Sequence, residues 1–214
     1  MPTKNGHEFV VVAFFSHDLK RVITGFSQKH QTRNFISDGL VPSDYDVNGG
    51  EEPTLVCAYR GLEEKAGISK SDIRVIKQIN MREWVAQDKV SRSAKFIEYF
   101  FVAVAKNELV LSKTVAKEGR LSDRNFTDIP FVLNSWKLPR GDKNRLNMYH
   151  AIGLTRGLLF ARDKFGATKE FAPFIQMLSE LQQRNGIVLD SYVTEIANCL
   201  RALKERRNRP VYVL

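Results

Sequence analysis

The feature that most constrains this chain is one helix with a clear start and a clear stop. Pro53 stands at its first position and Gly67 just past its last, the usual asymmetry of helix ends. Between them apolar residues recur at three- and four-residue spacing: Leu55, Val56, Tyr59, Leu62 and Ala66. Residues 36–50, rich in Gly, Asp, Ser and Pro, predict a loop before the helix. One face of this helix must therefore pack on the rest of the domain.

Strands are predicted on both sides of this helix. Residues 8–15 are almost continuously apolar and rich in β-branched and aromatic side chains, which predicts a buried strand. Residues 21–27 predict a second strand that forms a hairpin with the first. Residues 73–80 and 95–105 predict two more, and 107–111 either pair with the last strand or extend it. The expected class is α+β.

The pattern changes to a helical one after residue 140. Three helices are predicted, over residues 143–164, 170–184 and 190–206. Asp142 is placed to be the N-cap of the first. We therefore expect a first domain over residues 1–140 and a basic helical extension over 141–214 that packs on it.

Residues 49–68 carry a motif. Seven residues separate Glu52 from Arg60, and an aliphatic residue, a glutamate, a glycine and a second aliphatic residue follow at fixed positions: Leu62, Glu64, Gly67 and Ile68. This pattern resembles the Nudix box, and the surrounding strands suit it over residues 7–140. The resemblance implies a Nudix-like mixed sheet with a loop-helix-loop, and activity on nucleoside diphosphate-linked compounds.

Three positions depart from the family pattern. Asp46 stands where the box begins with glycine, Gly61 replaces the glutamate after the arginine, and Lys65 replaces the second of the paired glutamates. In the family those glutamates hold divalent cations. Positions 61 and 65 share one helical face. Because Mg²⁺ needs several oxygen ligands, Glu64 beside Lys65 is a poor site. We expect no catalytic residue, no metal site and no cofactor, with Mg²⁺ required only if the protein is active.

The substituted positions leave alternatives open. Gly61 costs about 1 kcal/mol relative to alanine in a helix. It reflects either drift after loss of the carboxylate, which we favour, or close approach by a ligand or another element. Lys65 either meets a ligand phosphate as a point charge or pairs with Glu64, Glu52 or Glu51. The resemblance implies that Glu52 and Arg60 bridge the loop to the helix.

Positive charge is concentrated near the C-terminus. The net charge is +9; residues 135–214 hold 14 lysines and arginines against 7 acidic residues, a net charge of +7. Such a field favours nucleic acid, with RNA preferred over DNA, or else serves solubility alone. The candidate contacts are Lys137, Arg140, Lys143, Arg145, Arg206, Arg207 and Arg209. Trp136 beside them either stacks on a base or is buried in a linker.

Cysteine usage and hydropathy bear on location. Cys57 and Cys199 have the contexts of buried reduced thiols, and no ligand spacing predicts a zinc site. No secretion signal and no apolar run long enough to cross a membrane is present. These features predict an intracellular, reducing compartment, cytoplasmic or other, and no membrane partner.

Three functions follow from the sequence. The first is a catalytically inactive Nudix-like protein that binds RNA or a nucleotide-bearing partner. The second is a Nudix hydrolase with a rearranged metal site built from some of Glu51, Glu52, Glu63 and Glu64, with Glu98 or Asp128 reaching in. The third is a structural subunit whose helical extension contacts protein partners.

Overall fold

The structure is a computed structural model that describes residues 6–18, 20–46, 50–87, 93–109, 111, 122–139, 141–147 and 150. Its strands are β1 (Gly6–Phe15), β2 (Arg21–Ser27), β3 (Thr32–Asn34), β4 (Ile36–Gly39), β5 (Ile73–Gln87), β6 (Ser93–Ala105) and β7 (Ser122–Asp128). The helices are α1 (Pro53–Ala66) and α2 (Ile129–Ser135), with 3-10 turns η1 (Pro42–Tyr45) and η2 (Lys70–Asp72).

The seven strands form one mixed sheet. Its main path runs β3-β2-β1-β6-β5, while β4 pairs with β1 and β7 with β2. The central pair β1–β6 is parallel, from Gly6 opposite Lys95 to Phe15 opposite Val104, and the other pairs are antiparallel. The predicted α+β class, with a mixed sheet and a loop-helix-loop, is thus confirmed.

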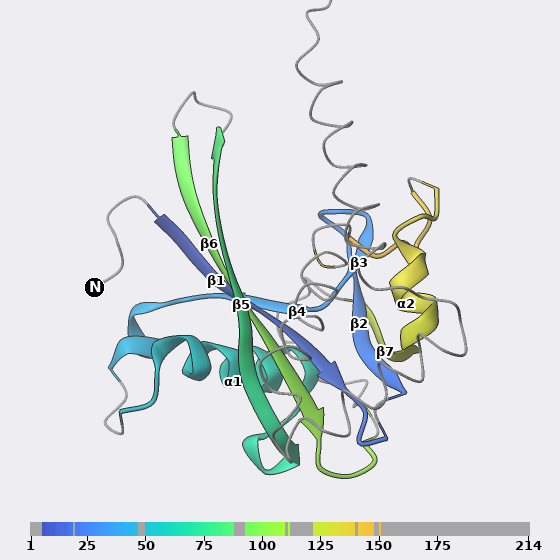
Figure 1. Ribbon diagram of the computed structural model, residues 1–214, viewed down its shortest axis with the longest axis horizontal. Helices are drawn as coiled ribbons and strands as arrows, with labels where there is room; N and C mark the ends of the chain where they lie inside the picture. The colour runs from blue at the N-terminus through green and yellow to red at the C-terminus, as the bar shows by residue number, and fades with distance from the viewer. Residues whose placement is uncertain are drawn as a thin grey trace, which may run out of the picture.

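Helix α1 lies across one face of the sheet, and α2 lies at the β2–β7 end (Figure 1). Alternation along the strands assigns side chains to the two faces. Val10, Val12 and Phe101 join Cys57 and Leu62 of α1 in one core cluster. Phe100, whose side chain alternates with that of Phe101, faces away from α1. The central strands β1 and β6 are therefore buried on both faces over residues 10–15 and 100–105, as near-continuous apolar runs predict.

Some predicted boundaries were wrong. Residues 36–39 form β4 rather than loop, because Ile36 to Gly39 pair with β1 between Val12 and Phe9. The strand predicted over 73–80 continues to Gln87, paired with β6 throughout. Residues 107–109 form no strand. Strands β3 and β7 and helix α2 were not predicted, since polar side chains dominate both short strands.

The predicted helix over residues 143–164 does not begin at 143. Residues 143–147 instead run beside β3, where Leu146 forms a parallel bridge with Arg33. Asp142 caps a turn rather than a helix, since its carboxylate accepts the Asn144 amide at 2.8 Å. His150 is helical and buried. The predicted helices over 170–184 and 190–206 lie outside the described residues.

None of the helices in the described ranges is long and apolar enough to cross a membrane.

The burial of Leu146 tests whether the chain beyond residue 140 stabilises the sheet. Leu146 is 1% exposed. Leu146→Ala should lower the free energy of unfolding by about 2–5 kcal/mol, because a buried leucine leaves a cavity. Urea denaturation measures the loss. Leu138→Ala, at a half-buried position, is the control and should cost clearly less. Equal, small effects of both substitutions would show that the segment is not packed on the sheet.

Candidate functional site

Helix α1, which carries the box residues, begins and ends where its sequence predicts. Pro53 stands in its first turn, and Gly67 adopts the left-handed conformation with φ of 69°. The Gly67 amide donates to the Glu63 carbonyl at 2.9 Å, and the Ile68 amide to the Leu62 carbonyl at 3.2 Å. These bonds satisfy carbonyls at the helix end and turn the chain toward η2 and β5.

Gly61 faces strand β4 at close range. A Cβ at position 61 would lie 3.2 Å from the Asp38 Cβ, 3.7 Å from Asp38 Oδ2 and 3.8 Å from Ile36 Cγ2. Of the explanations considered for Gly61, close approach by another element is therefore present, and that element is β4. A side chain at position 61, such as the family's glutamate, would crowd Asp38, which would have to shift by a few tenths of an ångström.

Asp38 binds both cations of the box helix. Its Oδ2 lies 2.5 Å from Arg60 Nη1, and its Oδ1 lies 2.8 Å from Lys65 Nζ. Lys65 Nζ also donates to the Ser37 carbonyl. Two roles were considered for Lys65, contact with a ligand phosphate and pairing with a carboxylate, and the structure contains the pairing. Its partner is Asp38 rather than Glu64, Glu52 or Glu51, because β4 lies against the face of α1 that carries Lys65.

Arg60 ties the helix to the loop before it. Its Nε and Nη2 donate to the two carboxylate oxygens of Asp44 at 3.1 Å, and Nη2 also donates to the Gly39 carbonyl at 2.8 Å. The bonds to Asp44, followed by the charge of Asp38, raise the pKa of Arg60. Glu64 lies 3.6 Å away on the same helix. Arg60 therefore joins loop to helix as implied.

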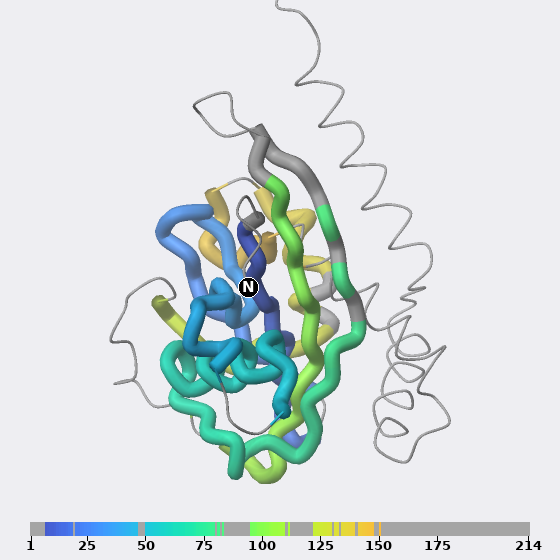
Figure 2. The backbone as a smooth tube through the Cα atoms, turned by 90° about the vertical axis from the view of Figure 1, so that its left-hand side faces the viewer, coloured from blue at the N-terminus to red at the C-terminus, as the bar shows by residue number. Residues whose placement is uncertain are grey.

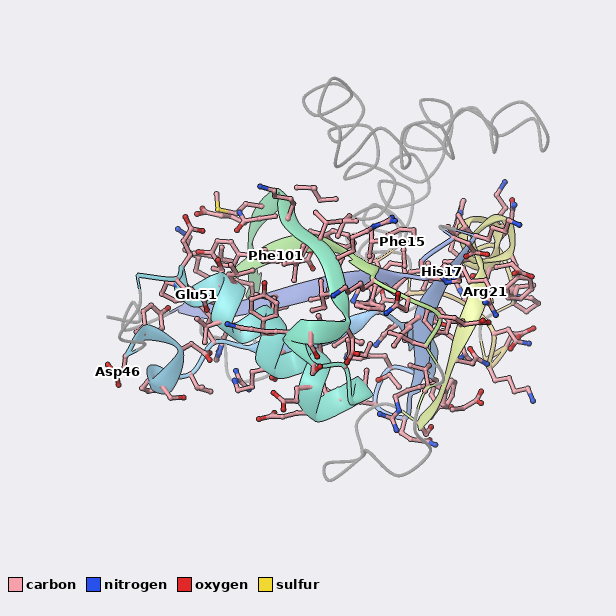
Figure 3. The ribbon with its side chains drawn as sticks, turned by 90° about the horizontal axis from the view of Figure 1, so that it is seen from below. Phe15, His17, Arg21, Asp46, Glu51 and Phe101 are labelled. Carbon is pink, nitrogen blue, oxygen red and sulfur yellow. The ribbon has the colours of Figure 1, made fainter. Side chains whose placement is uncertain are left out.

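Glu52, the other residue implied to bridge loop and helix, meets the helix through its backbone. The described structure contains no ion pair between Arg60 and Glu52, which precedes α1 and offers its backbone carbonyl to the amides of Leu55 and Val56. Asp44 is 2% exposed, and burial beside Arg60 makes it the stronger partner. Asp46, at the box's leading position, ends η1 and lies at the molecular end that also holds Glu51 (Figure 3).

The Cys57 thiol lies next to the side chain of Arg60 and the backbone of β4. Its Sγ lies 3.5 Å from the Gly39 carbonyl oxygen and 3.8 Å from that of Asp38. Burial, followed by the charge of Asp44, raises the pKa of the thiol to about 12. Cys57 is therefore a buried neutral thiol, as expected from its context. Cys199 lies outside the described residues.

The other carboxylates considered for a rearranged metal site do not converge on α1. Glu51 pairs with Lys70 at 2.9 Å. Glu98 lies on the sheet face opposite α1, since it alternates with Tyr99, which packs on the α1 cluster. Asp128 pairs in register with Arg21, at the end of the molecule opposite Glu51 (Figure 3). Among the described residues, no group of three His, Cys, Asp or Glu is arranged to hold a metal.

The candidate nucleic-acid contacts are only partly described. Lys137 and Lys143 are exposed and Arg145 is half-buried, whereas Arg140, Arg206, Arg207 and Arg209 lie outside the described residues. Trp136 is 5% exposed, with the Lys137 ammonium 5.5 Å from its ring centroid. Of the two roles weighed for Trp136, the buried one is present, so its ring is not available to stack on a base.

Sequence reasoning missed Asp38 and Asp44. Both lie in the stretch predicted as loop, 22 and 16 residues before Arg60. The missed signal is the pair of apolar residues Phe35 and Ile36 just before Asp38, which could have marked a short strand.

Comparison with solved structures gives the fold. The chain is similar to the Nudix domain of Shewanella oneidensis NrtR complexed with ADP ribose, with 15% identity over 76% of this chain and 90% of that one, and a TM-score of 0.53. It is also similar to the Bacillus subtilis pyrophosphohydrolase BsRppH, with 13% identity over 76% and 85% of the two chains and a TM-score of 0.51. No family model and no curated protein matches the sequence. At these identities the likeness shows the fold alone: the chain has the Nudix fold.

The contact at Gly61 reverses an ordinary expectation. Replacing glycine by alanine inside a helix usually raises the free energy of unfolding by about 1 kcal/mol. Gly61→Ala should instead lower the free energy of unfolding by about 1–3 kcal/mol, because the new methyl group meets an Asp38 held by two cations. Denaturant titration measures the change.

The control is Gly61→Ala in an Asp38→Gly background, which lacks the Asp38 Cβ that the new methyl group would contact. In that background Gly61→Ala should be neutral or stabilising, so the two substitutions couple in a double-mutant cycle. A Gly61→Ala protein more stable than the wild type would contradict the close contact.

Proposed function

We propose that this protein is a catalytically inactive Nudix-fold binding protein. The observation that carries the proposal is the Asp38 carboxylate, which adjoins Gly61 and pairs with Lys65 and Arg60. Of the family's metal-ligand positions, position 65 thus belongs to an internal ion cluster and position 61 lies against it. Its four charges, Arg60, Lys65, Asp38 and Asp44, cancel.

The residues present do not fit Mg²⁺. Of the family's three box positions, only Glu64 keeps a carboxylate, and it lies 3.6 Å from Arg60. Gly61 offers no donor, and the Lys65 ammonium would repel a cation. These residues therefore give a metal-dependent hydrolytic step no support. Lys65 is also a weaker candidate for a ligand phosphate than its sequence suggests, because Asp38 already neutralises it.

The alternative is a Nudix hydrolase with a rearranged metal site. Its support is the fold, which a pyrophosphohydrolase shares. The box glutamates that would remain to it are Glu52, Glu63 and Glu64. Because these lie on the helix or at its start, a rearranged site would need further donors from elsewhere in the chain.

A hydrolysis assay separates the two functions. We expect no appreciable turnover of ADP-ribose or nucleoside diphosphate-linked compounds with Mg²⁺ or Mn²⁺, measured by phosphate or nucleotide release. Turnover of about 1 s⁻¹ or faster, an ordinary enzyme rate, that is abolished by Glu64→Gln would establish the hydrolase. The Glu63→Gln protein is the matched control on the same helix. ADP-ribose binding should be measured alongside, since a Nudix domain of this fold was solved with it.

The proposed ligand is nucleic acid, RNA before DNA. The support is electrostatic: residues 135–214 carry a net charge of +7, and a field of this sign draws polyanions. A structural subunit with an acidic protein partner is the competing function for the same charge.

Salt dependence tests the nucleic-acid proposal. The wild type should bind single-stranded RNA at about 50 mM salt, with affinity that falls steeply as salt rises, because each phosphate contact releases counterions. Neutralising Arg206, Arg207 and Arg209 together should weaken binding and flatten the slope of log K against log salt by up to about three. Fluorescence anisotropy measures both. If the wild type binds neither RNA nor DNA under these conditions, the charge serves another partner.

A further inference from the structure

One edge of the sheet is completed by a distant segment of the chain. The Arg33 amide donates to the Arg145 carbonyl at 2.7 Å, and the Asn147 amide donates to the Arg33 carbonyl at 2.8 Å. Leu146 sits between these bonds in a parallel bridge with Arg33. Residues 145–147 therefore add to β3, which is the terminal strand of the main sheet path.

This pairing brings two parts of the chain that carry cations to the same edge of the sheet. In a parallel pair, residues before Leu146 run beside residues before Arg33. Arg145 is thus held against the edge strand β3, Lys143 lies in the turn just before it, and Lys29 lies in the turn that leads into β3. Lys29 and Lys143 are exposed and Arg145 is half-buried. We call Lys29, Lys143 and Arg145 the basic edge.

The basic edge keeps a net positive charge, because it holds three cations and residues 141–147 contain one acid, Asp142. No ion pair within the described ranges involves its three side chains. Asp123 is engaged with Arg33 at 2.9 Å, and Asp142 accepts the Asn144 amide. Burial, followed by the charge of Lys29, lowers the pKa of His30 in the same turn.

The backbone next to the basic edge is fixed by hydrogen bonds and packing. The buried Arg33 guanidinium donates to Thr24 in β2 and to Asp123 and Asn125 in β7, at 2.7–3.2 Å. Beyond Leu146, His150 Nδ1 accepts the Phe35 amide at 2.9 Å, and the two rings stack 5.7 Å apart. The backbones that carry the three cations are therefore positioned before any ligand arrives, which lowers the entropic cost of binding.

We propose that the basic edge binds the sugar–phosphate backbone of single-stranded RNA, with Lys29 as a phosphate contact alongside Lys143 and Arg145. The proposal rests on the proposed RNA-binding function and adds a contact from the β2–β3 turn. Cations on adjacent backbones, free of ion pairs among the described residues, suit a run of phosphates. An acidic protein partner is the competing occupant.

Lys29→Ala is the test, with oligouridylate as the probe and anisotropy as the readout across a salt series. A lost phosphate contact should weaken binding and reduce the salt slope by about one. Lys77→Ala is the matched control, because Lys77 is also an exposed lysine. It lies on β5 at the opposite end of the main sheet path, and Figure 2 shows the β2–β3 hairpin well separated from β5. The Lys77→Ala substitution should leave the slope unchanged.

The outcomes separate the two proposals. A wild type that binds RNA, with equal slopes for wild type, Lys29→Ala and Lys77→Ala, would overturn the basic edge and leave RNA binding intact. A wild type that binds no oligouridylate would overturn both and favour the acidic protein. Circular dichroism confirms that both variants are folded; Lys29 lies in an exposed turn, so its substitution should not disturb the sheet.

Discussion

The bond network around the Asp38 carboxylate links helix α1, strand β4 and the 3-10 turn η1. One carboxylate on β4 holds the guanidinium of Arg60 at one oxygen and the ammonium of Lys65 at the other. Through Arg60 it is joined to Asp44 in η1, so helix, strand and loop meet at one neutral cluster. The same side chain also sets how closely β4 and α1 approach at Gly61.

This network explains why two unusual box residues occur together. Glycine at 61 makes room for Asp38, and lysine at 65 supplies the charge that Asp38 needs in a partly buried place. Either change alone would leave a defect: a glutamate at 61 would crowd Asp38, and a glutamate at 65 would set a second carboxylate beside Asp38 with Arg60 as the shared cation. The two substitutions therefore form one structural unit with Asp38.

A second network stabilises the far side of the molecule. Buried Arg33 donates to strands β2 and β7, while its backbone pairs with residues 145 and 147. A buried arginine is tolerated only where its donors find acceptors, and here five hydrogen bonds provide them. Residues 145–147 are thereby hydrogen-bonded to the edge strand β3.

What the sequence by itself determined was local. The bounds of α1 follow from Pro53, Gly67 and the spacing of apolar residues between them, and the loss of carboxylates at positions 61 and 65 can be read directly. The central strands follow from apolar runs long enough to be buried on both faces. What only the tertiary structure decided was which distant residues meet: Asp38 with Lys65, Asp44 with Arg60, and Arg33 with Asn147. Short polar strands show no apolar periodicity in the sequence, and the sequence does not indicate which cation a given carboxylate pairs with. These pairings arise because the register of the sheet brings backbones together, and register depends on the packing of the whole domain.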